Sequence, residues 1–167
     1  MTDQPMIIVS SLNAAETARE RYHPGFIISI LDEGDLSPSV LNDVAPERHL
    51  TLNSSTVEEA KWCPLVLDFA NKWVKSGESL LIHCHRGVAR SMAIAYILMC
   101  VKEKNVCEQK IAGRLRAAAP HADPNLLLIS EADRMLGRDD RMISAVLDMC
   151  PCCSTVAAPI VTLPVAP

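Results

Sequence analysis

One short stretch of the sequence, HCHRGVARS at residues 83–91, carries the residue types of a nucleophilic site. Cys84 stands between two histidines, and two arginines and a glycine follow it before Ser91. A cysteine thiolate is a strong nucleophile, and a guanidinium presents parallel donors to two oxygens of a tetrahedral oxyanion. Between Glu78 and Glu103 the sequence has no acidic residue that would repel an anion or oppose ionisation of the thiol. The stretch therefore indicates attack of a thiolate on a bound phosphate-like group.

The loop that follows this cysteine is expected to bind the anion through its backbone. Residues 79–84 have the pattern of a buried strand and a helix opens at Arg90 and Ser91, so the residues between them must form a tight loop. In such a loop successive N–H groups point inward, and the helix N-terminus adds partial positive charge. Gly87 suits a sharp turn or a close approach of the backbone to a ligand. The same field favours the thiolate form of Cys84 near neutral pH.

Two side chains at the start of the helix would complete the chemistry. Arg90, six positions after Cys84, can reach back over the loop and present a planar fork of donors, which a lysine lacks. Ser91 can donate a hydrogen bond to the sulfur and ease its departure when a covalent intermediate breaks down. The stretch thus contains a nucleophile, an anion clamp and a partner for the leaving thiolate.

The remaining elements must position this loop. Strands alternate with helices in the first half of the chain, helices alone follow, and unalternating apolar runs suit strands covered on both faces. We therefore expect an α/β fold with a mostly parallel central sheet of about four strands, helices on both faces and a helical C-terminal half. Ligands of such sheets bind at the carboxyl ends of the strands. The predicted strands are residues 6–11, 26–31, 49–53 and 79–84, and the predicted helices begin near Asn13, at Ser55 behind a Ser55–Glu58 capping box, and at residues 90, 107, 125 and 140.

The length of the chain predicts one domain. Its 167 residues are enough to bury a core and too few for two domains of ordinary size. We assign residues 1–150 to a single domain. Residues 151–167, PCCSTVAAPIVTLPVAP, contain four prolines and no charged side chain, so we expect an extended C-terminal tail on the surface.

The charge of the chain argues against polyanionic partners. Sixteen Lys and Arg against twenty Asp and Glu give a net charge of −4, so we expect no nucleic-acid or membrane partner. The longest apolar run, residues 92–101, is about half of the roughly 20 residues that a membrane span needs. Residues 1–11, MTDQPMIIVSS, lack the basic and long apolar regions of a secretory signal, so we expect none. We expect a cytoplasmic protein.

The cysteines are expected to be reduced thiols. There are seven, an odd number, in a chain large enough to fold without disulfides. Cys150, Cys152 and Cys153 lie close together, but no second Cys-x-x-Cys or spaced histidine pair completes a zinc site. We predict no metal and no cofactor.

The arrangement of the signature resembles a known family. His83-Cys84-x5-Arg90-Ser91, between a hydrophobic strand and a helix, is similar to the signature of the cysteine-dependent protein tyrosine phosphatases, nearest their compact dual-specificity-like bacterial branch. A helix ending in Trp73, the segment IAGRLRAAAP and the segment ADPNLLLISEADRML agree with that arrangement. The resemblance covers roughly residues 26 to 137.

The resemblance implies a role for each residue of the signature. Cys84 would be the nucleophile, Arg90 the phosphate clamp and Ser91 the assistant to the leaving thiolate. His83 would hold the loop through hydrogen bonds, and Asn125 would brace it from behind. The phosphate-binding amides would come from His85, Arg86, Gly87, Val88 and Ala89, the first two of which either touch substrate side chains or remain solvated.

The general acid is the point at which the resemblance fails. The family carries an aspartate on the loop after the strand that precedes the signature strand, and residues 50–59 contain none. Asp32 and Asp35 both follow a neighbouring strand, and we name Asp32 as the candidate. Acidic residues at such places are often plain turn formers, however. Glu58 or Glu59 is an alternative, although Glu58 fits a capping box. A third alternative is that no acid exists, which would slow the enzyme by about 10²–10⁴ without abolishing thiolate attack.

These features together predict a protein tyrosine phosphatase. It would hydrolyse phosphorylated proteins or small phosphomonoesters, most of all phosphotyrosine, through a cysteinyl-phosphate intermediate and without metal. The first alternative is a catalytically weak phosphate-binding module. The second is a sulfurtransferase or an arsenate reductase, which would use the same loop cysteine, the reductase with a resolving cysteine near Cys84.

Overall fold

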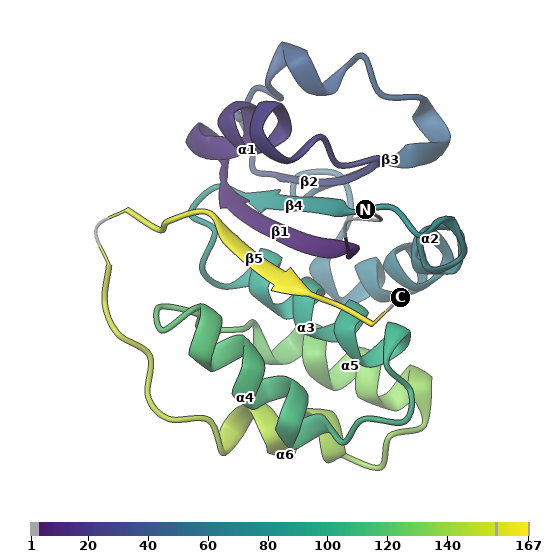
Figure 1. Cartoon of the computed structure of the whole chain (residues 1–167), viewed down its shortest axis with the longest axis vertical. Helices are drawn as coiled ribbons and strands as arrows, with labels where there is room; N and C mark the ends of the chain where they lie inside the picture. Colours follow the sequence, from purple (N-terminus) through teal and green to yellow (C-terminus); the bar gives the residue numbers. More distant parts are fainter. Residues whose placement is uncertain (1–3, 156, 167) are drawn as a thin grey trace.

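The computed structural model describes residues 4–155 and 157–166 and contains a five-stranded sheet with helices on both faces (Figure 1). The strand order is β3-β2-β4-β1-β5. All four predicted strands are confirmed, and a fifth strand adds to them. The strands are β1 (Met6–Ser11), β2 (Phe26–Leu31), β3 (His49–Asn53), β4 (Leu80–Cys84) and β5 (Val161–Pro164).

The first four strands form the parallel part of the sheet. β4 pairs with β1 on one side and β2 on the other, and β2 pairs with β3, all in parallel register. Every residue of β2 and β4 is buried, as the unalternating apolar runs predict for central strands. The carboxyl ends of all four strands therefore meet at one edge of the sheet.

The helices are divided unequally between the two faces. Ala15 and Ala18 of α1 (Ala15–Tyr22) pack with Ile8, Ile27 and Leu81 on one face. The other strand residues face a larger core, which the remaining five helices cover (Figure 1). These are α2 (Trp62–Ser76), α3 (Arg90–Lys102), α4 (Glu108–Ala118), α5 (Leu126–Leu136) and α6 (Arg141–Leu147).

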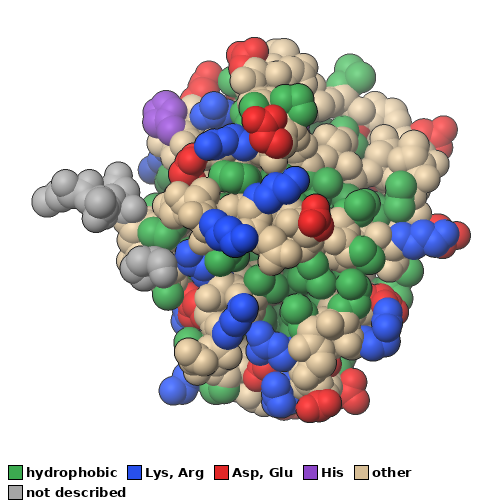
Figure 2. All heavy atoms as spheres, turned by 90° about the vertical axis from the view of Figure 1, so that its right-hand side faces the viewer, with side chains coloured by type: hydrophobic (Ala, Val, Ile, Leu, Met, Phe, Trp, Pro, Cys, Tyr) green, Lys and Arg blue, Asp and Glu red, His purple; other side chains and the backbone are tan. Residues whose placement is uncertain are grey.

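The helix after the signature loop is the centre of the larger core. Every residue of α3 from Ser91 to Cys100 is buried, because α2, α4 and α5 surround it. Among the described residues, no helix combines the length and apolar character that crossing a membrane requires. Figure 2 shows one face of the molecule, on which Lys and Arg side chains are interspersed with Asp, Glu and hydrophobic ones.

Two predicted helix caps are wrong. Asn13 does not cap a helix, since a 3-10 turn spans Leu12–Ala14 and α1 begins at Ala15 without a side-chain cap. The Ser55–Glu58 capping box does not form either. The amide and hydroxyl of Ser55 instead donate to Asn53 Oδ1 at 2.9 and 2.6 Å, because an Asn side chain readily closes a turn with the backbone two residues ahead.

The fifth strand comes from the segment expected to be a tail. β5 pairs antiparallel with β1, which makes the sheet mixed. Val161 and Leu163 are buried against the larger core, and Val165 is buried beside them. The Val165 amide donates to the Pro5 carbonyl at 3.1 Å. Residues 161–165 therefore cover the edge of β1 as part of the core, and for them the expected surface tail is wrong, although the chain is extended there.

We predict that β5 contributes measurably to stability. Leu163 has only 2% of its surface exposed, and truncation of a buried leucine typically costs about 2–5 kcal/mol because a cavity remains. Leu163→Ala should therefore lower the free energy of unfolding in urea by at least about 2 kcal/mol. Leu147→Ala, at a side chain 63% exposed, is the matched control and should change it by about 0.5 kcal/mol or less. Equal effects of the two substitutions would show that β5 is not part of the core.

Candidate active site

The loop between β4 and α3 passes close to the end of β1. Gly87 has a φ of +70°, a region that favours glycine. A Cβ atom there would lie 2.8 Å from the Ser11 nitrogen and 2.9 Å from the Ser10 carbonyl carbon. The Leu12 amide donates to the His85 carbonyl at 3.3 Å. The glycine is therefore required by both its dihedral angle and its close approach to β1.

The sulfur of Cys84 lies at the base of this loop. Its side chain is 3% exposed. The Gly87 amide donates to Sγ at 3.2 Å, and the Ser91 hydroxyl lies 3.0 Å from Sγ. The geometry fits a nucleophilic thiolate whose departure the Ser91 hydroxyl assists.

Arg90 faces the same cavity as Cys84. The two residues line a pocket of about 220 Å³ together with Asp32, Asp123 and residues of the loop. The guanidinium of Arg90 makes two parallel hydrogen bonds to Asp32, with Nη1–Oδ1 at 2.6 Å and Nη2–Oδ2 at 2.7 Å. This is the bidentate geometry in which arginine binds carboxylates and phosphates. The two terminal nitrogens of Arg90, which the sequence analysis assigns to an oxyanion, are thus bound to a carboxylate of the protein itself.

Asp32 is fixed in this position by its surroundings. The Ser54 hydroxyl, on the segment after β3, donates to Asp32 Oδ1 at 2.9 Å. The hydrogen bond from Arg90 is the main cause that lowers the pKa of Asp32 to about 2, and the Ser54 hydrogen bond and the charges of Arg90 and His85 add to it against the opposing effect of burial. Asp32 is therefore ionised at neutral pH in this arrangement.

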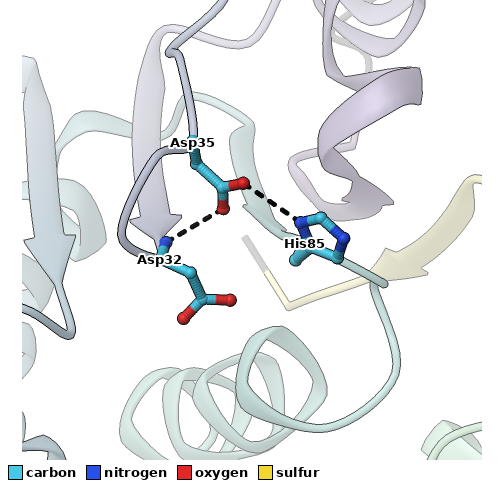
Figure 3. A group of neighbouring side chains, drawn as sticks. All are labelled: Asp32, Asp35 and His85. Atoms are coloured by element: carbon cyan, nitrogen blue, oxygen red, sulfur yellow. Dashed lines mark hydrogen bonds and ion pairs between the residues drawn. The ribbon is translucent and has the colours of Figure 1, made fainter.

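Asp35 and His85 stand beside Asp32. The Asp32 amide donates to Asp35 Oδ2 at 2.9 Å, and Asp35 Oδ1 lies 3.1 Å from His85 Nδ1 (Figure 3). Ligand atoms of the three residues lie within 4.8 Å of one another, a spacing that fits a metal ion. Both oxygens of Asp32 are already bound to the Arg90 guanidinium, however, so a metal ion there would have to compete with a fixed cation. Asp35 orients the loop that carries Asp32.

The two glutamates considered as general acids differ in position. Glu58 is exposed and forms an ion pair with Lys61 at 3.3 Å on the surface. Glu59 Oε1 lies 3.7 Å from Arg90 Nη1, and its Oε2 accepts a hydrogen bond from Asn125 at 3.2 Å. Glu59 is therefore a second carboxylate beside the guanidinium, whereas Glu58 faces solvent.

Asn125 links the signature loop to α5. Its amide donates to the Ala89 carbonyl at 3.2 Å, and its Oδ1 accepts from the Leu128 amide at 3.1 Å as the N-cap of α5. The amide of Asp123 donates to the Val88 carbonyl at 3.0 Å. The two backbone bonds brace the outer side of the loop, whereas the Asn125 side chain caps α5, so a bracing role for that side chain stays a prediction.

His83 holds the sheet rather than the loop. Its Nε2 lies 2.7 Å from Ser29 Oγ on β2, and that hydroxyl lies 2.8 Å from His49 Nε2 on β3. A hydrogen-bonded row thus crosses three strands directly beneath the site. Hydrogen bonds from His83 to the loop, which the resemblance implies, are not found among the described residues.

Sequence reasoning missed several residues around the site. Ser54 gave no signal because a serine in a turn is common. Asp123 was passed over although it lines the pocket. A second cavity of about 250 Å³ adjoins the first and shares His85, Arg86 and Val88 with it. Its other walls combine the end of β1 with the C-terminal segment, through Ser11, Asn13, Thr155, Ala157 and Ala158.

The fold is similar to those of several solved phosphatase structures. Human DUSP28 matches with a TM-score of 0.56 and 16% identity, over 80% of this chain and 90% of that chain. Human tyrosine phosphatase-like serine/threonine/tyrosine-interacting protein matches with a TM-score of 0.60 and 12% identity, over 80% and 92%. The PTP-2 phosphatase of Cydia pomonella matches with a TM-score of 0.56 and 16% identity, over 98% and 96%.

At these identities the likeness shows the fold, and the predicted α/β class is confirmed. No protein-family model matches the chain, and no curated protein matches it either.

The buried histidine of β4 predicts a pH dependence of stability. Burial lowers the pKa of His83 from 6.5 to about 4, and the nearby His49 adds to this effect against an opposing contribution from Asp35. The unfolded chain therefore binds a proton below pH 6.5 that the folded chain does not bind until about pH 4. The contribution of His83 to the free energy of unfolding is therefore fully present above pH 6.5 and is lost as the pH drops toward 4. The loss from this group amounts to up to about 3 kcal/mol.

Urea denaturation between pH 7 and pH 4.5 would measure this dependence. His83→Gln should remove most of the slope, leaving the smaller contributions of His49 and His121, whose pKa values burial also lowers. His23→Asn, at an exposed histidine, is the control and should keep the slope. An unchanged slope in His83→Gln would contradict the assignment.

Proposed function

We propose that the chain is a phosphomonoester hydrolase that works through a cysteinyl-phosphate intermediate and needs no metal. The observation that carries the proposal is the position of the Cys84 sulfur. It is hydrogen-bonded to the Gly87 amide and the Ser91 hydroxyl in a pocket that Arg90 also lines. One cavity thus contains a nucleophile, a hydroxyl that can donate a hydrogen bond to the thiolate when it leaves, and a guanidinium that can bind the anion. The phosphatase fold of the similar structures adds support.

The reaction would proceed in two steps. In the first, Cys84 Sγ attacks phosphorus while the loop amides and Arg90 hold the phosphoryl oxygens; the S–P bond forms, the P–O ester bond breaks and the leaving oxygen takes a proton. In the second, a water molecule attacks phosphorus and gives a proton to the carboxylate that protonated the leaving oxygen, the S–P bond breaks, Cys84 departs as a thiolate and inorganic phosphate leaves. The Ser91 hydroxyl, 3.0 Å from the sulfur, would stabilise the thiolate as it leaves.

Asp32 is the general acid that the geometry favours. It lines the pocket, whereas Glu58 faces solvent and Asp35 is engaged with His85. While it is bound to Arg90 it is ionised and has no proton to give. A phosphoryl dianion on Arg90 would remove that partner and place negative charge nearby, and both changes raise the pKa of a carboxyl group. Glu59, 3.7 Å from Arg90, is the second candidate.

Phosphorylated proteins, above all phosphotyrosine proteins, are the proposed substrates, with dual specificity as the alternative. Similar structures include those of a human tyrosine phosphatase-like protein and a mouse dual specificity phosphatase. A cytoplasmic location is proposed from the sequence, whose odd number of cysteines favours reduced thiols. Placement in a compact bacterial branch remains a prediction from sequence, as does the assignment of residues 1–150 to one catalytic domain, to whose sheet β5 adds a strand.

The alternatives make different demands on the same pocket. An arsenate reductase would need a resolving cysteine, and among the described pocket-lining residues Cys84 is the one cysteine. A sulfurtransferase would form a persulfide from thiosulfate. A phosphate-binding module would bind vanadate without turnover. Turnover of a phosphomonoester separates all three from the proposed function.

Substitution of Cys84 should abolish turnover of p-nitrophenyl phosphate, and substitution of Arg90 should strongly reduce it. Cys84→Ser should leave no measurable activity, and Arg90→Lys should lower kcat by about 10²–10³, because one planar oxyanion clamp is lost. Vanadate should inhibit the wild type. Cys107→Ser, at an exposed cysteine, should retain wild-type activity. Activity that survives Cys84→Ser would remove the proposal, and vanadate binding without any turnover would establish the binding module instead.

The general acid should be visible in the dependence of rate on the leaving group. Asp32→Asn should lower kcat for phenyl phosphate by about 10²–10³, since a poor leaving group needs a proton. For 2,4-dinitrophenyl phosphate, whose leaving group departs unprotonated, the loss should be less than about threefold. Equal losses on both substrates would exclude Asp32 as the proton donor, and Glu59→Gln would then be measured in the same way.

A further inference from the structure

The phosphate clamp of the proposed site is already occupied by the chain. Both terminal nitrogens of Arg90 are bound to the two oxygens of Asp32, at 2.6 and 2.7 Å. A phosphoryl group and a carboxylate both offer two adjacent oxygens to the guanidinium fork. A ligand that uses the fork must therefore take the place of the Asp32 side chain.

Asp32 is held firmly enough to compete with a ligand. Ser54 donates to one of its oxygens at 2.9 Å, and its own amide is bound to Asp35. A group tethered so close to its partner acts at an effective concentration of mM or higher, on the order of that found for short linkers. A free monoanion offers Arg90 the same two oxygens and the same single charge as Asp32. It therefore displaces the carboxylate poorly.

A dianion has two advantages over the internal carboxylate. Its second charge and its additional oxygens can bind the loop amides and the N-terminus of α3, which Asp32 does not reach in its described contacts. The Asp32 side chain is 40% exposed, so it can turn toward solvent when displaced. Glu59, 3.7 Å from Arg90, is a second carboxylate beside the guanidinium.

We propose that Asp32 determines the charge class of the ligand: it competes for Arg90, so that dianionic phosphomonoesters bind and monoanionic groups such as phosphodiesters and carboxylates are rejected. This inference rests on the proposed function for the identity of the anion site. It adds a binding role for Asp32 that precedes any transfer of a proton. It also explains why a carboxylate stands in a pocket built to receive an anion.

Anion binding without turnover tests this inference. In the Cys84→Ser background, calorimetry at pH 8 would measure the affinities of inorganic phosphate, a dianion at this pH, and of dimethyl phosphate, a monoanion. Adding Asp32→Asn should tighten phosphate binding about tenfold, in line with the loss of a charge-assisted hydrogen-bonded competitor. It should tighten dimethyl phosphate binding more than phosphate binding, and an unchanged ratio of the two affinities would overturn the inference. Asp32→Ala should act in the same direction.

Asp123→Asn is the matched control. Asp123 lines the same pocket, and its neutralisation changes the net charge by the same amount. It should tighten phosphate binding less than threefold. The inference is overturned if Asp32→Asn and Asp32→Ala leave phosphate affinity unchanged or weaken it, or if Asp123→Asn matches their effect, which would reduce the role of Asp32 to general charge repulsion. Absence of phosphate binding in every variant would contradict the proposed function itself.

Discussion

The site depends on the Arg90 guanidinium, which must bind negative groups in turn. In the structure it binds both oxygens of Asp32, and in the proposed reaction it binds the phosphoryl group. The Cys84 sulfur lies in the same pocket and would carry negative charge as well. Three anions cannot be accommodated beside one guanidinium at little cost, so the carboxylate must move away or accept a proton when the phosphate enters. Competition for Arg90 and proton donation are therefore two consequences of one electrostatic constraint.

The parallel sheet is what brings these groups together. β2 ends just before Asp32, β3 just before Ser54, and β4 at Cys84. β1 ends beside Gly87, where any side chain would collide with the Ser11 backbone. Each parallel strand thus contributes to one edge of the sheet, as expected for ligand sites in α/β folds. Beneath them the row of His83, Ser29 and His49 crosses β4, β2 and β3 and fixes the strands that present the site.

Features that depend on local sequence were predictable, and features that depend on distant contacts were not. Three of the four parallel strands are built on apolar runs, β3 is a short alternating segment, HLTLN, and the loop from Cys84 to Arg90 is defined by its own spacing. β5 is short and ends at a proline, and only its pairing with β1 makes it a strand. The ion pair of Asp32 with Arg90 joins residues 58 positions apart. The sequence placed Asp32 at the correct edge of the sheet, but only the register of the strands decides that its carboxylate meets the guanidinium.

The most direct test of this account is a crystal structure of the wild-type protein with bound vanadate. The account predicts a vanadium atom bonded to the sulfur of Cys84, two vanadate oxygens on the terminal nitrogens of Arg90, and the Asp32 carboxylate turned away from the guanidinium. Vanadate bound elsewhere, or vanadate in the loop with Asp32 still paired to Arg90, would contradict it.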